Sequence, residues 1–426
     1  MLSTPLAATL ARRDIHYGWV VVAVTFLSML VSAGAVGAPG VLLLPLQREF
    51  GWDTADISLA MAIRLLLFGL MGPFAAAMIN RFGVRRMVLS SLTLVGGGLF
   101  ASLAMREVWQ LILLWGFVVG FGTGLTAMVL GATIATRWFV ARRGLVIGLL
   151  TASSATGQLV FMPLLSMLTE AYGWRSAIAL LCGLIAVAAL AMLALMRDRP
   201  ADLGLSAFGE VGSAPPAAPA GAILPAALGA LREAAVTRTF WVLFATFFIC
   251  GASTNGLIQT HLIPLCVDFS VPEVQAAGLL AVMGIFDFIG TVGSGWLSDR
   301  YDNRWLLVWY YGLRGLSLLY LPYSDFTLYG LSLFAVFYGL DWIATVPPTV
   351  RLTAERFGRE RANLVFGWVF AGHQLGAAVA AFGAGLSRTA LQSYLPAFAT
   401  AGALCLLAAL LVPMIGSRAK PATTKA

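Results

Sequence analysis

The chain consists of long apolar runs that are separated by short polar stretches. A membrane-spanning helix needs about 20 mostly apolar residues. Counting such runs predicts twelve transmembrane helices, at residues 18–43, 57–79, 87–105, 109–135, 144–168, 175–196, 240–265, 274–298, 305–323, 328–350, 362–387 and 392–415. The ninth and tenth runs are the weakest, because they contain Arg314 and Asp341. The pattern predicts an all-α polytopic membrane protein.

The composition agrees with this prediction. Hydrophobic residues make up 60% of the 426 residues and charged residues only 11%, with a mean hydropathy of +0.88. A soluble domain carries roughly 25% charged residues. The formal net charge is +8, but the basic residues lie in short clusters between apolar runs. This distribution argues against a nucleic-acid partner, which would need one basic face.

The basic clusters also predict how the chain is oriented. With the N-terminus in the cytoplasm, 21 of the 27 Arg and Lys residues fall in cytoplasmic loops and tails, and four fall in outer loops. Positively charged loops are retained on the cytoplasmic side. We therefore expect a multi-pass protein of the cell (inner) membrane with both termini in the cytoplasm.

The chain repeats itself at an offset of 219 residues. At this offset Arg85 coincides with Arg304, and Arg137 coincides with Arg356. One constant offset across two separate loops indicates two parallel six-helix halves, related by an axis along the membrane normal.

A stretch rich in Ala, Pro and Gly separates the two halves. It is predicted to be a cytoplasmic linker at residues 197–236, between a first bundle at 1–196 and a second bundle with a short cytoplasmic tail at 237–426. Part of the linker, at about 222–235, is predicted to form an amphipathic helix along the membrane face.

Two loop motifs resemble the signature of the major facilitator superfamily. The second-half copy reads GWLSDR at residues 295–300 and is followed by Arg304, while the first-half copy reads NRFG at 80–83 and is followed by Arg85. The first copy departs from the family pattern, because Asn80 stands where an aspartate is usual. The resemblance covers nearly the whole chain and implies two six-helix bundles, twelve helices in all.

Shorter motifs are similar to the monocarboxylate-transporter-like branch of this superfamily. They are YGW at residues 17–19, RWF at 137–139, RRG at 142–144 and HLIP at 261–264. The resemblance implies a secondary transporter that works by alternating access. In that branch an arginine that holds the substrate carboxylate follows an aspartate by four residues. Asp287 matches the aspartate, but Thr291 stands at the position of the arginine.

The charged loops suggest a latch between two conformations. Asp299 can accept hydrogen bonds at the N-terminus of a neighbouring helix, and Arg300 and Arg304 can bridge to carboxylates or lipid phosphates. We therefore expect a cytoplasmic gate made by both loop copies, from Asn80, Arg81, Arg85, Asp299, Arg300 and Arg304. The alternative is that these loops only fix the topology.

Five ionisable residues stand out within the apolar runs: Arg64, Asp287, Arg314, Asp341 and His373. Each costs about 2.5–3.5 kcal/mol on an insertion scale and so needs a reason. We expect Arg314 to be a structural partner of Asp287 or Asp341. The remaining acid is then a candidate proton carrier, and His373 could share that role. Alternatively, His373 is a neutral group bonded within the bundle.

Of these five residues, Arg64 is the only one in the first half. A buried cation without an acid nearby can receive a carboxylate ligand. Arg64 is therefore a candidate substrate anchor in place of the arginine that is missing at Thr291. The alternative is that its long side chain extends to the outer membrane interface.

Further substrate-binding candidates are polar residues near the middle of the second half, namely Asn255, Gln259, Asp341, His373 and Gln374. Each amide can instead bond to a neighbouring helix. The sequence contains no phosphate-binding loop, no metal-ligand cluster and no catalytic constellation. We therefore expect no enzymatic activity, no metal and no cofactor.

Together these features predict a secondary transporter of a small solute, an organic anion or monocarboxylate, that is coupled to protons. Its expected partners are the solute, protons and membrane lipid, and it is expected to be a monomer. Two alternatives stay open: an exporter of amphipathic compounds, and a membrane sensor with the same fold that binds a ligand without transporting it.

Overall fold

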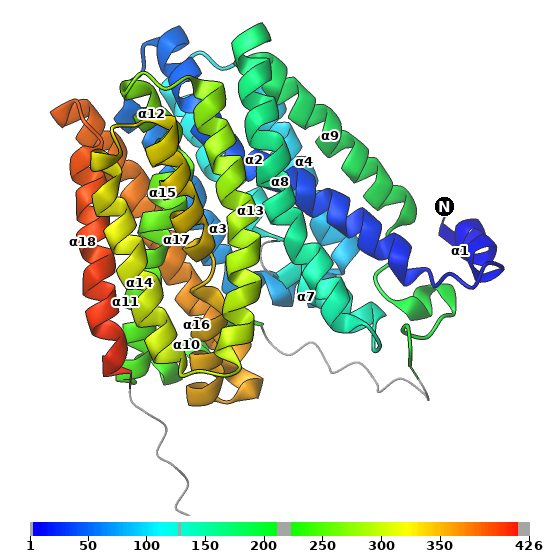
Figure 1. Cartoon of the computed structure of the whole chain (residues 1–426). Helices are drawn as coiled ribbons and strands as arrows, with labels where there is room; N and C mark the ends of the chain where they lie inside the picture. Colours follow the sequence, from blue (N-terminus) through cyan, green and yellow to red (C-terminus); the bar gives the residue numbers. More distant parts are fainter. Residues whose placement is uncertain (1–2, 127–128, 211–222, 416–426) are drawn as a thin grey trace, which may run out of the picture.

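The computed structural model describes residues 3–126, 129–210 and 223–415. These residues are almost entirely helical, and the β-structure among them is one isolated bridge between Phe139 and Phe208. Figure 1 shows two bundles of roughly parallel helices side by side, with most of the first half on the right and the second half on the left.

The first half contains six membrane crossings after the short helix α1 (Ser3–Ala11). They are α2 (Gly18–Phe50), α3 (Thr54–Phe82), α4 (Val84–Ser102), a composite fourth crossing, α8 (Arg143–Tyr172) and α9 (Trp174–Leu195). The fourth crossing consists of α5 (Val108–Leu111), the π-helical segment η1 (Ile112–Val119), α6 (Gly120–Gly124) and α7 (Val129–Trp138).

The second half repeats this plan. Its crossings are α11 (Arg238–Gly251) continued by the π-helical η3 (Ala252–Ile258) and α12 (Gln259–Asp268), then α13 (Glu273–Ser298), α14 (Asn303–Tyr320), α15 (Leu328–Asp341) with α16 (Val346–Phe357), α17 (Arg359–Leu391) and α18 (Leu395–Leu411). Short 3-10 turns η2 (Pro200–Leu203), η4 (Leu321–Ser324) and η5 (Val412–Met414) lie at helix ends.

The linker contains the helix α10 (Ile223–Ala235), where the sequence predicts one at about 222–235. Trp368 Nε1 on α17 donates to the Ala227 carbonyl at 2.9 Å, and Arg361 pairs with Glu233. These contacts hold α10 against the second half. Residues 211–222 lie outside the described part of the chain.

The predicted helical membrane fold is confirmed. Among the described residues, nine helices are long and apolar enough to span a membrane, and shorter apolar helices cover 108–124 and 160–172. Several crossings extend beyond the predicted limits: α2 runs to Phe50 and α17 to Leu391. Helices continue past the apolar core, so a hydropathy count underestimates their length.

The tenth crossing is broken where the sequence predicts one continuous run at 328–350. Helix α15 ends at Asp341 and α16 begins at Val346. Pro347 and Pro348 follow the break, and neither has an N–H group to bond a carbonyl four residues earlier. The fourth crossing is also discontinuous, between Gly124 and Val129. The offset of 219 residues places the two breaks at equivalent positions.

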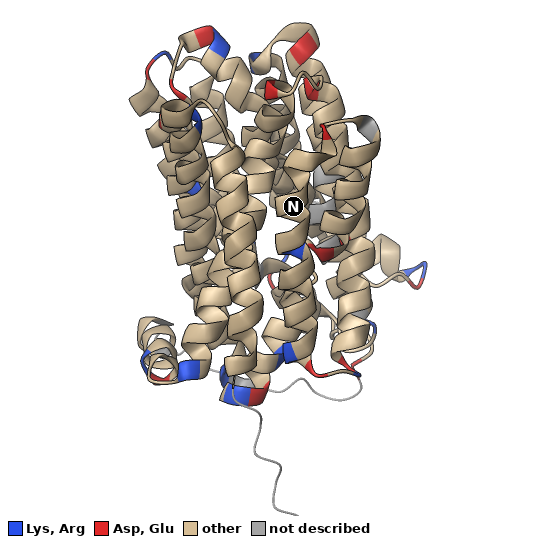
Figure 2. Cartoon of the chain, turned by 60° about the vertical axis from the view of Figure 1, so that its left-hand side comes forward, with Lys and Arg blue, Asp and Glu red and all other residues tan. Residues whose placement is uncertain are grey.

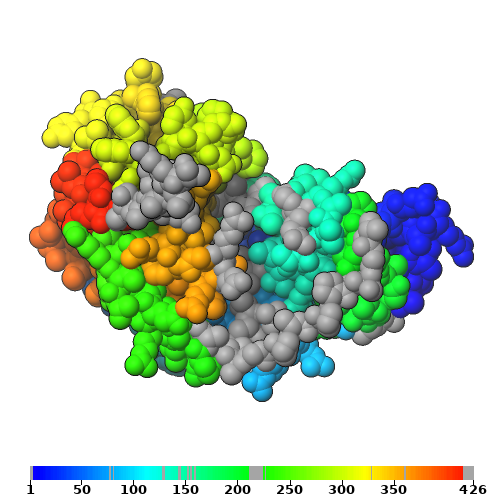
Figure 3. All heavy atoms as spheres, turned by 90° about the horizontal axis from the view of Figure 1, so that it is seen from below, coloured from blue at the N-terminus to red at the C-terminus, as the bar shows by residue number. Residues whose placement is uncertain are grey.

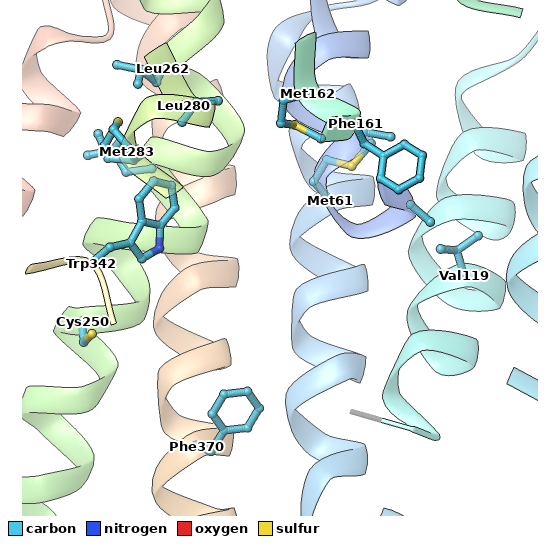
Figure 4. Packing of buried hydrophobic residues seen from close by; sticks show 14 of the residues in the cluster. Met61, Val119, Phe161, Met162, Cys250, Leu262, Leu280, Met283, Trp342 and Phe370 are labelled. Carbon is cyan, nitrogen blue, oxygen red and sulfur yellow. The ribbon is translucent and has the colours of Figure 1, made fainter. Parts of the chain in front are cut away.

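Charged residues gather at the two ends of the bundle and are sparse in its middle, as Figure 2 shows. Large side chains fill the interior of both halves. Figure 4 shows Phe161 and Met162 of the first half, and Met283 and Trp342 of the second, all buried. This distribution matches a protein whose middle is surrounded by lipid.

The two halves contact each other through α3 against α17 and through α8 against α13. They also meet through α2 and α12, and Arg48 at the end of α2 lies 2.6 Å from Glu273 at the start of α13. We call this end of the molecule the Arg48 end, and the opposite end, which carries α10, the linker end. Viewed from the linker end in Figure 3, the two halves appear as two lobes side by side.

Candidate functional site

Arg314 is fully buried and makes four polar contacts at the break in the tenth crossing. Its Nε lies 2.7 Å from Asp341 Oδ2, and its Nη1 lies 2.9 Å from Cys250 Sγ. Its Nη2 donates to the carbonyls of Asp341 and, at 3.0 Å, Trp342. Of the two acids that the sequence offered as partners, the structure therefore brings Asp341 to Arg314.

Helix α13 supplies hydrogen-bond partners for two backbone groups at the break, the Ile343 N–H and the Ala344 carbonyl. Asp287 Oδ1 accepts from the Ile343 N–H at 2.9 Å and from Thr291 Oγ1 at 3.1 Å. Ser294 Oγ donates to the Ala344 carbonyl at 2.5 Å. That carbonyl has no helical partner, because Pro348 cannot donate to it. Thr291, at the position of the missing arginine, thus orients Asp287.

Sequence reasoning missed Ser294. It lies seven residues after Asp287, and residues at this spacing share one face of a helix. The spacing was visible in the sequence, but nothing in the sequence indicated that this face meets the break in the tenth crossing.

His373 and Gln374 lie on α17 in different surroundings. The His373 ring is buried, with its centroid 4.8 Å from that of Phe247 and 5.6 Å from that of Phe370. Gln374 is only 1% exposed and faces Gly69 of α3. Among the described residues, neither His373 Nδ1 nor the Gln374 amide has a hydrogen-bond partner.

Arg64 is 3% exposed, so its side chain is buried among the helices. Its Nη1 donates to the Val36 carbonyl on α2 at 2.8 Å, and its Nε has no acceptor in the described part of the chain. No carboxylate of the described residues lies within ion-pair distance of it. The guanidinium is therefore buried with unused hydrogen-bonding capacity.

A cavity of about 290 Å³ lies near Arg64, which is not itself one of the residues that line it. Val36, which accepts from Arg64, is in its wall, and so is Phe68, one helical turn after Arg64 on α3. Its polar lining consists of Ser28, Ser32, Ser91, Thr123, Thr126 and Gln259. All of these except Gln259 belong to the first half.

Most of the predicted substrate-binding residues do not line this cavity. Gln259 does, whereas Arg64, Asn255, Asp341, His373 and Gln374 are absent from its lining. Sequence reasoning also missed the hydroxyl residues. Ser28 and Ser32 are four residues apart and share a face of α2, but Ser91 comes from α4 and Thr126 from the turn that follows α6.

The second-half loop forms two ion pairs, one within the loop and one with α16. Asp299 pairs with Arg351 of α16, so it contacts a side chain and not the helix N-terminus that we expected. Asp302 takes that role, since it accepts from the Arg304 N–H at 2.9 Å and pairs with its guanidinium at 2.6 Å. The hydrogen bond from Arg304 lowers the pKa of Asp302. Arg300 lies over the Trp296 ring, 4.1 Å from its centroid.

In the first-half loop, the acidic partner of the Arg85 backbone comes from the linker. Asp198 Oδ1 accepts from the Arg85 N–H at 2.8 Å, and Arg85 Nη2 donates to the Leu193 carbonyl at 2.6 Å. Arg81 lies over the Phe82 ring, 5.5 Å from its centroid. The side chain of Asn80 lies outside the described part of the structure.

Comparison with known proteins agrees with this architecture. The family model of the Major Facilitator Superfamily matches residues 25–381 and 267–426. An uncharacterized MFS-type transporter, YcxA, of Bacillus subtilis (strain 168) is 25% identical over 371 residues, which cover 83% of this chain and 84% of the relative. Monocarboxylate transporter 4 of Rattus norvegicus is 26% identical over 431 residues, covering 97% of this chain and 87% of the relative.

Two repeated six-helix halves with polar groups buried between helices define a multi-pass membrane protein of the secondary-transporter class. The chain belongs to the major facilitator superfamily. It is a transporter by family, and its monocarboxylate-transporter relatives are similar to it at low identity.

Proposed function

We propose that the protein carries a small organic anion across the cell membrane by alternating access, together with a proton. The observation that supports this most is Arg64, which is buried near the cavity without a carboxylate partner among the described residues. A carboxylate ligand would complete its pairing, and guanidinium–carboxylate pairs are strong and directional. Arg64 would then replace the anchor that is missing at Thr291.

Proton coupling rests on the two acids of the second half. Asp341 is paired with Arg314 at 2.7 Å, whereas Asp287 accepts only from a backbone N–H and a hydroxyl. Asp287 is therefore the carboxylate without a countercharge in contact, and we assign it the role of proton carrier. His373, which lies between two aromatic rings, is the second candidate.

The orientation follows from the basic loops. We place the linker end and both termini in the cytoplasm, since positively charged loops remain on that side. The Arg48–Glu273 contact, which joins the two halves at the other end, then corresponds to a state that is closed to the outside. The protein is proposed to act as a monomer in the inner membrane, in contact with lipid.

The test is proton movement in lightly buffered proteoliposomes that are challenged with a panel of small carboxylates. We expect a carboxylate to drive proton uptake in the wild type, and Arg64→Gln and Asp287→Asn to abolish it. Arg106→Gln, which changes an exposed arginine, is the matched control and should keep the wild-type rate. Uptake that is unchanged in Arg64→Gln would refute the role of Arg64.

The competing proposal is an exporter of amphipathic compounds. It is supported by the cavity wall, which also contains Met29, Phe68 and Ile147, and by Thr291 in place of the arginine. If no carboxylate moves protons but an amphipathic compound dissipates an imposed proton gradient, the exporter is the better description. Saturable binding without any flux would instead support a sensor.

A further inference from the structure

Most of the hydroxyl groups around the cavity have already committed their hydrogens to the protein, and Ser32, which has no hydrogen-bond partner among the described residues, is the exception. Ser28 Oγ donates to the Val24 carbonyl at 2.9 Å, and Thr123 Oγ1 donates to the Val119 carbonyl at 2.9 Å. A hydroxyl has one hydrogen to donate and two lone pairs. What these side chains can still offer to a ligand is therefore an acceptor.

The same holds for the pair of hydroxyls at the break in the fourth crossing. Ser91 Oγ donates to the Gly122 carbonyl at 2.7 Å and lies 3.1 Å from Thr126 Oγ1. Because the Ser91 hydrogen is used, Thr126 must be the donor in the second contact. Both hydrogens are thus committed, and lone pairs remain.

In the second half, a charged side chain donates hydrogen bonds to the carbonyls at the equivalent break in the tenth crossing. There the Arg314 guanidinium donates to the carbonyls of Asp341 and Trp342. The offset of 219 residues relates Asp341 to Gly122 and Arg314 to Val95, which is apolar. The first half therefore has no charged donor at this position, and it has the cavity beside the break.

Two lining side chains, Ser32 and Gln259, have no hydrogen-bond partner among the described residues and can still both donate and accept. Gln259 of α12 is 8% exposed, and its amide has no hydrogen-bond partner among the described residues. It reaches the cavity from the second half, so a ligand held there would contact both halves. Along α2 the lining extends from Val36, which bonds Arg64, to Ser28. This is eight residues, or about 12 Å of helix.

We propose that the substrate is an elongated carboxylate that carries a hydrogen-bond donor, a phenolic or alcoholic hydroxyl or an N–H, at the end remote from its carboxylate. The acid group lies at the Val36 end of the cavity, next to the buried Arg64, the apolar middle lies against Phe68 and Met29, and the donor faces the acceptors at Ser91, Thr126 and Ser28. The cavity of about 290 Å³ is near the roughly 300 Å³ at which pockets for drug-sized ligands begin. This inference deepens the proposed function and rests on it for the carboxylate end only.

The test uses matched ligands that differ in the donor. Binding of 4-hydroxyphenylacetate, 4-methoxyphenylacetate and phenylacetate to the purified protein is measured by tryptophan fluorescence, beside the neutral pair 4-ethylphenol and 4-ethylanisole. We expect each hydroxyl compound to bind about fivefold or more tightly than its partner, as one well-made hydrogen bond allows. Phenylacetate separates the loss of the donor from the bulk of the methyl group.

Two variants and one control locate the effect. Thr126→Val and Ser28→Ala each remove an acceptor from a different part of the cavity wall. In both variants the ratio of the affinities of the hydroxyl and methoxy compounds should fall towards one. Thr25→Val is the control, since Thr25 is buried on α2 and donates to the Val21 carbonyl at 2.7 Å but does not line the cavity. It should keep the wild-type preference.

The outcomes separate this inference from the proposed function. Equal binding of hydroxyl and methoxy compounds, binding of none of them, or a preference that survives in both variants would overturn the inference. If no carboxylate is transported but 4-ethylphenol is still preferred over 4-ethylanisole in a manner that depends on Thr126, the donor site stands and the proposal of anion transport is wrong. If a carboxylate without a donor is transported and the hydroxyl compounds are not preferred, the proposal of anion transport stands and the donor site is wrong.

Discussion

Arg48 and Glu273 join the two halves at one end of the molecule, with Arg48 Nη1 2.6 Å from Glu273 Oε1. Arg48 ends α2 of the first half, and Glu273 begins α13 of the second. The pair lies at the end opposite α10, where we propose that the protein faces the outside. It can form only when the two halves are closed at that end.

Reversing one charge of this pair should open the Arg48 end. The Arg48 side chain is 63% exposed, and exposed pairs contribute about 0–1 kcal/mol, so we expect Arg48→Glu to shift the equilibrium by up to about fivefold. The measurement is the labelling rate of a Ser58→Cys variant by an impermeant maleimide added outside. The double variant Arg48→Glu/Glu273→Arg should restore the slow rate, and the parent without Ser58→Cys gives the background. A fast rate that persists in the double variant would contradict the pairing.

Adding a methyl group at Gly40 should also open the Arg48 end. A Cβ atom built there would lie 2.4 Å from the Gln259 carbonyl oxygen of α12, closer than the atoms can approach. Gly40→Ala should therefore push α2 and α12 apart and increase labelling of Ser58→Cys. Gly97→Ala is the control, because a Cβ there meets no atom within 4 Å in the described structure. Equal labelling in the two variants would show that this contact does not close the halves.

Removing Arg314 should cost more than removing the whole ion pair. Arg314→Met leaves the buried Asp341 without its countercharge, which costs about 3–5 kcal/mol in comparable pairs. The double variant Arg314→Met/Asp341→Leu leaves no buried charge and should be the more stable of the two. Thermal unfolding in detergent compares them. If the double variant unfolds at a lower temperature than the single one, the Arg314–Asp341 pair stabilises the fold by more than neutralising a buried charge.

Ser294→Ala should destabilise the second half. The substitution removes the donor to the Ala344 carbonyl, and a buried acceptor without a partner costs about 1–3 kcal/mol. The expected result is a lower unfolding temperature in the same assay. Thr400→Ala is the control, since Thr400 is exposed and bonds within its own helix. Equal unfolding temperatures would mean that water or another group satisfies Ala344.

The partners of the charged residues show where sequence reasoning reached its limit. The cost of burying Arg314 in an apolar run made an acidic partner necessary, and the sequence narrowed it to Asp287 or Asp341. The choice depended on the break after Asp341, which turns the Asp341 side chain and two carbonyls towards Arg314. Likewise Asp299 pairs with Arg351, 52 residues away, and no local pattern links the two.

The sequence by itself determined the helical membrane fold, the superfamily and the identity of the buried charges. Apolar run length and the cost of a charge in lipid act locally along the chain, so they are visible without a structure. Only the tertiary structure decided which carboxylate faces Arg314, that Arg64 bonds a carbonyl of α2, and that hydroxyls from α2, α4 and the fourth crossing surround one cavity. These relations depend on how separate helices rotate and pack against each other, and that geometry is a property of the whole assembly.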